Sequence, residues 1–351
     1  MLSMHYIGLD IHKKSISCCV RQSDGTIIEE STLAANRPAL DLWISRLPQP
    51  WIAGMEATMF TAWVYDHLVS HSGTVKIAHP AMLKAITASK KKNDRVDAQK
   101  ISDLLRCNFF PECHMATREI RDRRRVLRYR NLLVRQSVQM KNRVSSMLME
   151  TGVSYNKQKL HQKRYFGRLL EEEGSTMPES MPNLLRLSRS TVDSLTQMDH
   201  QLIRALRSDD VLASRVARLQ TIPGVGPILS LTWALEIGDV TRFKTVKSAV
   251  SYCGLCGDEQ SSAGKTQRTP ISKQRNKHLQ TVLVEAAKVG PRWSPELAAV
   301  YESERSKGNR NRGTLAVARK LVAYLLAIDR GDRKFEPRPK DVVPAVAVQP
   351  C

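Results

Sequence analysis

The stretch "HYIGLD", residues 5–10, begins an alternation of short β-rich runs and turns that covers residues 4–35. The runs "SISCCVRQ" and "TIIEESTL" follow it, and Asp24 and Gly25 supply a turn between these two. Runs of β-branched and aromatic residues that are bounded by turn residues indicate strands. The sequence therefore predicts three antiparallel strands at the start of the chain.

Helices and strands alternate beyond residue 35. Asn36 is a candidate helix cap with Pro38 in the first turn, and "WIAGM" (51–55) then reads as a short apolar strand. A helix is expected over about 60–70, and the strand "TVKIAH" (74–79) is ended by Pro80. The predicted order is three strands followed by helix, strand, helix, strand and helix. This is the order of an RNase H-like (RuvC-like) fold. We therefore predict an α/β domain of this class over residues 1–112.

Four acids stand at defined places in these predicted elements. Asp10 ends the first strand, and Glu56 follows the fourth in "GMEAT". Asp94 and Asp97 lie three residues apart in "NDRVDAQKISDLL" (93–105), on one face of a helix. Any one of them alone could be a solvated or capping acid, and Asp94 could simply face the helix dipole. Their joint placement predicts a catalytic site with two divalent ions about 4 Å apart, Mg²⁺ or alternatively Mn²⁺.

The charge of the chain points to a polyanionic partner. The 351 residues include 55 Lys and Arg but only 34 Asp and Glu, which gives a formal net charge of +21 and a pI near 9.9. Such an excess favours nucleic acid. No apolar run approaches the roughly 18 residues that cross a bilayer, and the scattered cysteines suggest reduced thiols. The expectation is a cytoplasmic protein without a membrane partner.

A long basic helix is predicted over 118–152, where Val126, Leu133, Met140 and Met147 recur every seven residues. A second helical stretch over 181–219 would pair with it as an antiparallel hairpin, or each would pack on a second subunit. We therefore predict a helical coiled-coil linker over 113–215. Its arginine run has few acids of its own, so phosphate contact is favoured over a solvated helix face.

Two motifs follow the predicted linker. In "TIPGVGP", Gly224 and Gly226 precede a helix that begins near Pro227, as in a helix-hairpin-helix turn that grips a phosphate; a simple interhelical turn is the alternative. In "QSSAGK", Ser261 and Ser262 lie in a polar loop followed by basic residues. A basic loop could stabilise charge around a serine nucleophile, or the serines could merely donate hydrogen bonds to phosphate. The residues predicted to contact nucleic acid are Lys90, Lys91, Lys92, Arg121, Arg124, Arg125, Arg128, Gly224, Gly226, Lys265, Arg268 and Lys273.

The chain resembles the DEDD transposases of the insertion-sequence one-ten type, relatives of the pilin-gene invertase and of the bridge-RNA-guided recombinases. The resemblance spans roughly residues 6–327 and is carried by "YIGLDIHKKS", "GMEAT", "KNDRVDAQKI", "TIPGVGP", "YCGLCGDEQSSAGK", "ISKQRNKHLQ" and "AVARKLVAYLL". It implies a RuvC-like first domain, a coiled-coil linker and a mostly helical C-terminal transposase domain. It also implies a dimer or tetramer, and a structured non-coding guide RNA that pairs with donor and target DNA.

Residue by residue, the resemblance places the metal-binding tetrad on Asp10, Glu56, Asp94 and Asp97 and the serine nucleophile on Ser262. The chain has Gly257 where the family usually has Pro, and Ser262-Ala263 where it has Ser-Gly. Ser261 therefore remains an alternative nucleophile.

These features predict a catalytic domain over 1–112, a helical linker over 113–215, a transposase domain with the serine loop over 216–330 and a flexible tail over 331–351. The predicted function is that of a transposase or site-specific recombinase. Two other classes remain open: a junction-resolvase-like nuclease that uses metal and water, and a non-catalytic nucleic-acid-binding protein.

Overall fold

The computed structural model describes residues 3–71, 73–87, 93–257, 259–262, 264–268, 271–272 and 274–337. The chain divides into two compact units, Met1–Arg118 and Glu119–Cys351. Within the described ranges, none of the helices is both long enough and apolar enough to cross a membrane.

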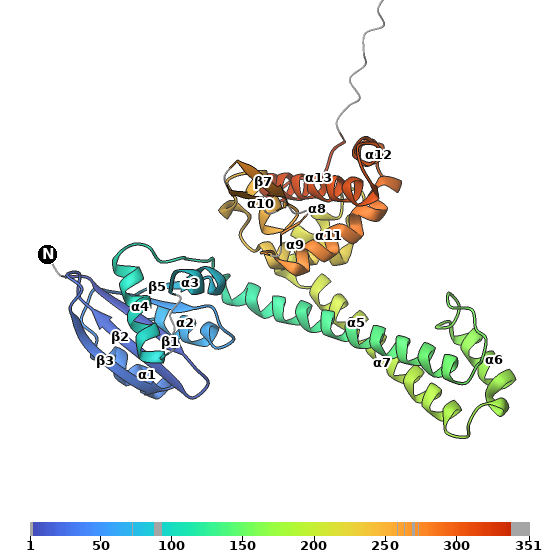
Figure 1. The fold of residues 1–351 in the computed structure, drawn as a ribbon, viewed down its shortest axis with the longest axis horizontal. Coiled ribbons are helices and arrows are strands. Elements are labelled where there is room, and N and C mark those ends of the chain that lie inside the picture. Colours follow the sequence, from blue (N-terminus) through green and yellow to red (C-terminus); the bar gives the residue numbers. More distant parts are fainter. Residues whose placement is uncertain are drawn as a thin grey trace, which may run out of the picture. The chain divides into compact units, whose positions relative to one another are not determined.

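The first unit is built on a five-stranded mixed sheet (Figure 1). Its strands are β1 (His5–Ile11), β2 (Ser15–Arg21), β3 (Ile27–Ala34), β4 (Trp51–Glu56) and β5 (Thr74–Ala78). They lie in the order β3-β2-β1-β4-β5; β1, β2 and β3 are antiparallel, and β1, β4 and β5 are parallel. The predicted α/β start of the chain is confirmed, and this order is consistent with an RNase H-like fold.

Helices cover both faces of this sheet. They are α1 (Arg37–Ile44), α2 (Thr61–Val69), α3 (Pro80–Thr87) and α4 (Asp94–Arg106). Leu40 of α1 and Leu68 of α2 share a core with Leu9 of β1, so α1 and α2 cover the face to which Leu9 points. Because side chains alternate along a strand, Gly8 faces the opposite side. There a Cβ on Gly8 would lie 1.9 Å from the Ala98 carbonyl oxygen, so α4 packs directly on the strand backbone.

The second unit contains a long helical arm. It is formed by α5 (Arg118–Glu150), α6 (Lys163–Glu173) and α7 (Met181–Arg207). Met147 near the end of α5 shares a core with Phe166 of α6 and Leu185 near the start of α7. Arg130 of α5 pairs with Asp199 of α7. The two long helices therefore run antiparallel (Figure 1).

Two details of the arm differ from the prediction. The stretch expected as one helix over 181–219 is broken at Asp209, whose side chain accepts a hydrogen bond from the Val211 N–H and caps a separate helix, α8 (Asp210–Leu219). On α5, Leu133 and Met147 are buried, but Val126 and Met140 are only half-buried.

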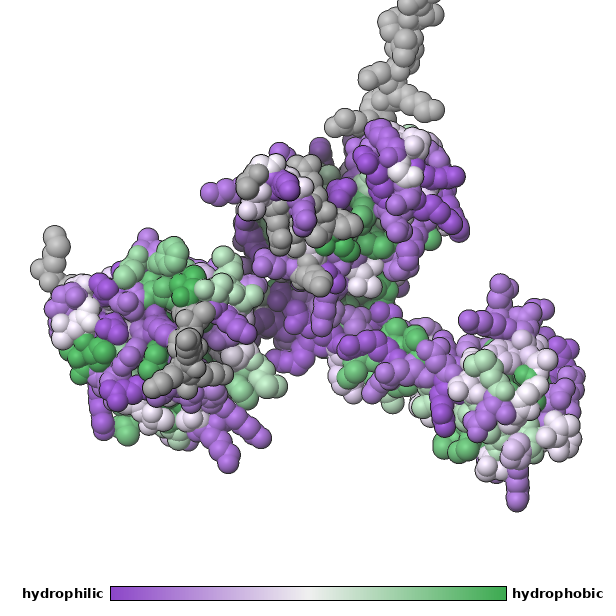
Figure 2. All heavy atoms as spheres, in the orientation of Figure 1, coloured by the Kyte–Doolittle hydropathy of each residue, from purple (hydrophilic) through white to green (hydrophobic). Residues whose placement is uncertain are grey.

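The remainder of the second unit is mostly helical, as predicted. Its elements are α9 (Pro227–Ile237), α10 (Val246–Tyr252), β6 (Glu259–Ser262), β7 (Lys265–Arg268), α11 (Lys277–Val289), α12 (Pro295–Ser306) and α13 (Arg310–Gly331), with short 3₁₀ turns at Gly174–Thr176, Val240–Arg242 and Gly290–Arg292. Residues Leu229–Ile237 of α9 are all buried, and Trp233 donates to Asp329 of α13. Hydrophilic side chains dominate the surface around α12 (Figure 2).

Candidate active site

Asp10 and Glu56 lie side by side at one end of two parallel strands. β1 and β4 are in register from His5 beside Trp51 to Leu9 beside Met55, so Asp10 comes next to Glu56. Glu56 is the last residue of β4, where its carbonyl accepts from the Thr61 hydroxyl at 2.6 Å as the chain leaves the sheet.

A pair of glycines explains why these acids face α4. Gly8 lies beside Gly54, and a Cβ at Gly54 would approach a Leu105 side-chain carbon of α4 to 2.8 Å. Each glycine is followed two residues later by an acid, Asp10 in β1 and Glu56 in β4. Residues two apart on a strand share a face, so the glycines admit the helix and the acids project from the same side.

Asp94 and Asp97 are the acids of the first turn of α4, which Asn93 caps by accepting from the Arg95 N–H. Asp97 also pairs with Lys100, one turn along, at 3.5 Å. The packing of α4 on Gly8 directs this first turn toward the end of β1.

His12 joins the acids from the strand and the helix. Its Nε2 lies 3.1 Å from Asp10 Oδ2 and 3.4 Å from Asp94 Oδ1. Burial raises the pKa of the Asp10 carboxyl; His12 opposes this shift, and the negative charges of Asp94 and Asp97 add to it. The structure thus brings Asp10, Asp94 and Asp97 within electrostatic reach of one another, and the strand register adds Glu56.

This donor set fits a divalent cation. Carboxylate oxygens are the ligands that hard cations such as Mg²⁺ and Mn²⁺ prefer. The ligand atoms of Asp10, His12 and Asp94 lie within 4.8 Å of one another. A cation would relieve the repulsion between the acids that contributes to the raised pKa of Asp10.

Sequence reasoning missed His12. Its signal was present in "YIGLDIH", because residues 10 and 12 are two apart at a strand end and therefore share a face. A histidine beside a carboxylate cluster can bridge the acids by hydrogen bonding or add a nitrogen ligand.

The predicted serine loop is a two-stranded antiparallel hairpin. Ser262 at the end of β6 pairs with Lys265 at the start of β7, and Ser261 pairs with Thr266. Both serines are exposed. Directly opposed residues of a hairpin point to one face, and neighbours along a strand point to opposite faces. Ser262 therefore shares its face with Lys265, whereas Ser261 shares the other face with Thr266.

The glycine motif has a packing role at one position and an exposed helix start at the other. Gly224 has a φ of +82°, and a Cβ there would lie 2.9 Å from the Gly290 Cα, so both backbone conformation and space require glycine. Gly226 is exposed and is the N-cap residue of α9. The positive end of the α9 dipole therefore reaches the surface at Gly226. Phosphate contact at this turn stays a prediction.

A buried carboxylate holds two of the predicted phosphate-binding arginines. Glu236 of α9 is 1% exposed and accepts from Arg128 Nε and Nη2, each at 2.9 Å, and from Asn276 Nδ2 at 2.9 Å. Arg124 donates to the Leu235 carbonyl at 2.9 and 2.8 Å. Burial disfavours ionisation of Glu236, but Arg128, Asn276 and Arg124 outweigh it and lower its pKa. Arg124 and Arg128 thus hold α5 against α9.

The arginine run has few acids on its own helix, but acids elsewhere in the second unit supply partners: Asp209 for Arg123, Glu236 for Arg128 and Asp199 for Arg130. Arg125 is exposed and pairs with Asp122, and Arg121 is half-buried. Nucleic-acid contact by these arginines stays a prediction.

Several predicted contacts fall outside the described part of the chain. They are Lys90, Lys91, Lys92 and Lys273, together with the side chain of Arg268, whose backbone ends β7.

Two family models match separate parts of the chain. A family model described as "Transposase IS116/IS110/IS902 family" matches residues 216–302, and a DEDD transposase model of the IS110 type matches residues 7–153. The first match contains the serine hairpin, and the second contains all four acids.

Individual relatives match over much of the chain. It is 26% identical over 295 residues to a transposase for insertion sequence element IS1328 from Yersinia enterocolitica, covering 82% of this chain and 84% of the relative. It is 24% identical over 291 residues to a transposase for insertion sequence element IS1111A from Coxiella burnetii, covering 82% and 78%. A pilin gene-inverting protein of Moraxella bovis is 29% identical over 149 residues, covering 42% of this chain and 46% of that protein.

Proposed function

Because the chain belongs to the IS110-type DEDD transposase family, we propose that it cuts and rejoins DNA with a divalent-metal site in its first unit and a serine nucleophile in its second. The observation that carries this proposal is the convergence of the acids. Two strands present Asp10 and Glu56 on the face where α4 brings Asp94 and Asp97.

The acids would hold the metal, and Ser262 would supply the nucleophile. Bound Mg²⁺ or Mn²⁺ would neutralise charge on the scissile phosphate and lower the pKa of the attacking hydroxyl. The Ser262 Oγ attacks phosphorus and forms a phosphodiester to the protein, while the bond to one deoxyribose oxygen breaks and that oxygen leaves as a hydroxyl. Because the bond energy is kept in the phosphoserine link, a DNA hydroxyl can reverse the step and rejoin the strands without an energy cofactor.

The hairpin register supports Ser262 over Ser261. Ser262 lies directly opposite Lys265, whose ammonium on the same face can stabilise negative charge at phosphorus. Ser261 lies opposite Thr266, which carries no charge.

The acids and the serine belong to different compact units. We propose that one reaction centre takes its acids from one subunit and Ser262 from another subunit of a dimer or tetramer. Mg²⁺ or Mn²⁺ remains the expected metal, with donor and target DNA as substrates.

Removal of the metal tests the acid site directly. We expect a chelator to abolish strand cleavage by the full chain, and Mg²⁺ or Mn²⁺ to restore it, because the carboxylates alone repel the phosphate. Cleavage is measured on a plasmid that carries the insertion sequence with its flanking DNA. DNA binding measured in parallel should persist in chelator, since the basic surface is unchanged. Cleavage that continues in chelator would contradict the metal site.

The second expected partner is a structured guide RNA, which would take over sequence recognition by base pairing. The excess of basic residues gives such an RNA a phosphate-binding surface. We expect sequencing of the RNA that copurifies with the protein to return one discrete structured species encoded beside the gene. A mixture that follows cellular RNA abundance would reject a dedicated guide and leave the metal-and-serine proposal standing.

A further inference from the structure

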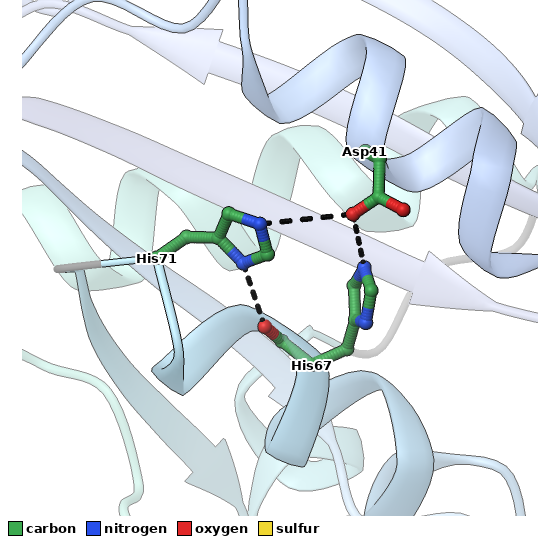
Figure 3. Close-up of side chains that lie close together, drawn as sticks. All are labelled: Asp41, His67 and His71. Atoms are coloured by element: carbon green, nitrogen blue, oxygen red, sulfur yellow. Dashed lines mark hydrogen bonds and ion pairs between the residues drawn. The ribbon is translucent and has the colours of Figure 1, made fainter.

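A second cluster of metal-ligating side chains lies in the first unit, in the helical layer opposite α4. Asp41 belongs to α1, His67 belongs to α2, and His71 lies two residues beyond the end of α2 (Figure 3). Leu40, next to Asp41, and Leu68, next to His67, pack on the sheet face that carries Leu9. This cluster is therefore separated by the sheet from the acids that face α4.

The two imidazoles converge on one carboxylate oxygen. His67 Nε2 lies 2.7 Å from Asp41 Oδ1, and His71 Nε2 lies 3.6 Å from the same oxygen. The ring centroids are 5.2 Å apart, and all three ligand atoms lie within 4.8 Å of one another. The separation of four residues between the histidines places both rings on one side of the end of α2.

The backbone fixes the orientation of His71. Its Nδ1 lies 2.8 Å from the His67 carbonyl oxygen, and a carbonyl oxygen only accepts hydrogen bonds. Nδ1 therefore carries the proton, and in the neutral ring Nε2 keeps its lone pair. A hydrogen bond from the second ring nitrogen to a carbonyl is the usual support of a metal-binding histidine.

Asp41 forms a close ion pair with His67 only. At 3.6 Å the Asp41 oxygen is too far from His71 Nε2 for a hydrogen bond, so the His67 carbonyl holds the His71 ring and its Nε2 has no hydrogen bond to Asp41. A tetrahedral zinc ion with bonds of about 2.0–2.1 Å would place its ligand atoms about 3.3 Å apart. The observed separations of 2.7 and 3.6 Å fall on either side of that value.

We propose that Asp41, His67 and His71 form a binding site for a transition-metal cation of the Zn²⁺ class, which links α1 to α2. Two imidazole nitrogens and one carboxylate oxygen suit Zn²⁺, Co²⁺ or Ni²⁺, whereas Mg²⁺ takes oxygen ligands. The side chains of His71 and Asp41 are 35% and 51% exposed, so a water can complete the coordination. For Nε2 of His67 to bind the metal it must carry no proton, so the neutral ring is then protonated at Nδ1.

Co²⁺ is the probe that tests this site in the full-length protein, because its visible absorption reports nitrogen coordination. Millimolar Mg²⁺ is kept present so that the carboxylate site holds a hard cation. We expect one Co²⁺ per chain with low-coordinate absorption bands, displaced by stoichiometric Zn²⁺ and not by further Mg²⁺. Thermal unfolding should shift upward with added Zn²⁺ by mass action.

Matched variants locate the binding. His67→Gln and His71→Gln should each weaken Co²⁺ binding by more than about a hundredfold, since even indirect supports of metal ligands contribute 10–100-fold. His200→Gln removes an exposed histidine of α7 and should leave binding unchanged. Asp10→Asn should also retain it, which separates this site from the acid site. If a histidine variant does not fold, Asp41→Asn replaces it in this test, because Asp41 is exposed and its substitution should weaken Co²⁺ binding without unfolding the protein.

The proposal is overturned if Co²⁺ binding survives in the folded His67→Gln and His71→Gln proteins, if Asp10→Asn abolishes it, or if no saturable site is found. In the last case the cluster is an ion pair only. Co²⁺ binding that is lost in Asp10→Asn would place the metal at the acid site instead; none of the other outcomes bears on strand cleavage, so the transposase proposal is tested separately.

Discussion

Asp10→Asn is expected to lower DNA strand cleavage by at least about a thousandfold, which corresponds to about 4 kcal/mol of lost transition-state stabilisation. The side chain keeps its shape but loses the charge that binds the metal. Cleavage is measured on the element-bearing plasmid with saturating Mg²⁺. Nucleic-acid binding should stay close to that of the unchanged protein, because a single acid contributes little to the basic surface.

The thermal stability of this variant provides a second test. Burial and two neighbouring acids disfavour the charged form of Asp10, so an uncharged amide relieves repulsion in the metal-free protein. Without metal, the thermal unfolding temperature of Asp10→Asn should therefore equal or exceed that of the unchanged protein. A residue needed only for folding would show the opposite result.

Asp103→Asn is the matched control for this experiment. Asp103 lies in α4 with Asp94 and Asp97 but pairs with Arg106 at 2.8 Å, at the other end of the helix. We expect it to cleave DNA normally. Near-normal cleavage by folded Asp10→Asn protein would refute the metal-site assignment.

The strand end and helix start that carry the acids could be predicted because local rules fix them. A β-rich run marks β1, a short apolar run marks β4, and the stretch that begins at Asn93 marks the start of α4. How closely α4 approaches the sheet depends on space: Gly8 and Gly54 leave no side chain between helix and strands. The repeated pattern of a glycine two residues before an acid was visible in the sequence, but its meaning required the strand register.

The arginine run shows where sequence reasoning stops. Counting acids within one helix cannot reveal Glu236, which is more than 100 residues away along the chain and pairs with Arg128 through tertiary packing. The register of the serine hairpin was equally hidden, because "QSSAGK" has the polar composition of a loop. The hairpin register places the two serines on opposite faces, with Ser262 opposite Lys265.

Ser262→Ala should abolish a covalent protein–DNA adduct that the unchanged protein forms. If the serine attacks phosphorus, denaturation during the reaction leaves DNA attached to residues 119–351, seen as a band of reduced mobility and mapped by peptide mass spectrometry. Losing the nucleophile removes the step altogether, so the adduct should fall below detection. Ser261→Ala is the matched control, since this neighbour lies on the other face of the hairpin and should still form the adduct.

Mixing two inactive proteins then tests how the acids and the serine meet. If different subunits supply them, Asp10→Asn protein mixed with Ser262→Ala protein assembles some centres with intact acids from one chain and an intact serine from the other, and part of the activity returns. A mixture without activity, alongside an adduct in the unchanged protein, would place both within one chain.

An adduct that maps to Ser261 would move the nucleophile by one residue. Active protein that never forms an adduct would instead favour a nuclease in which metal-bound water attacks the phosphate, because hydrolysis leaves no link to the protein.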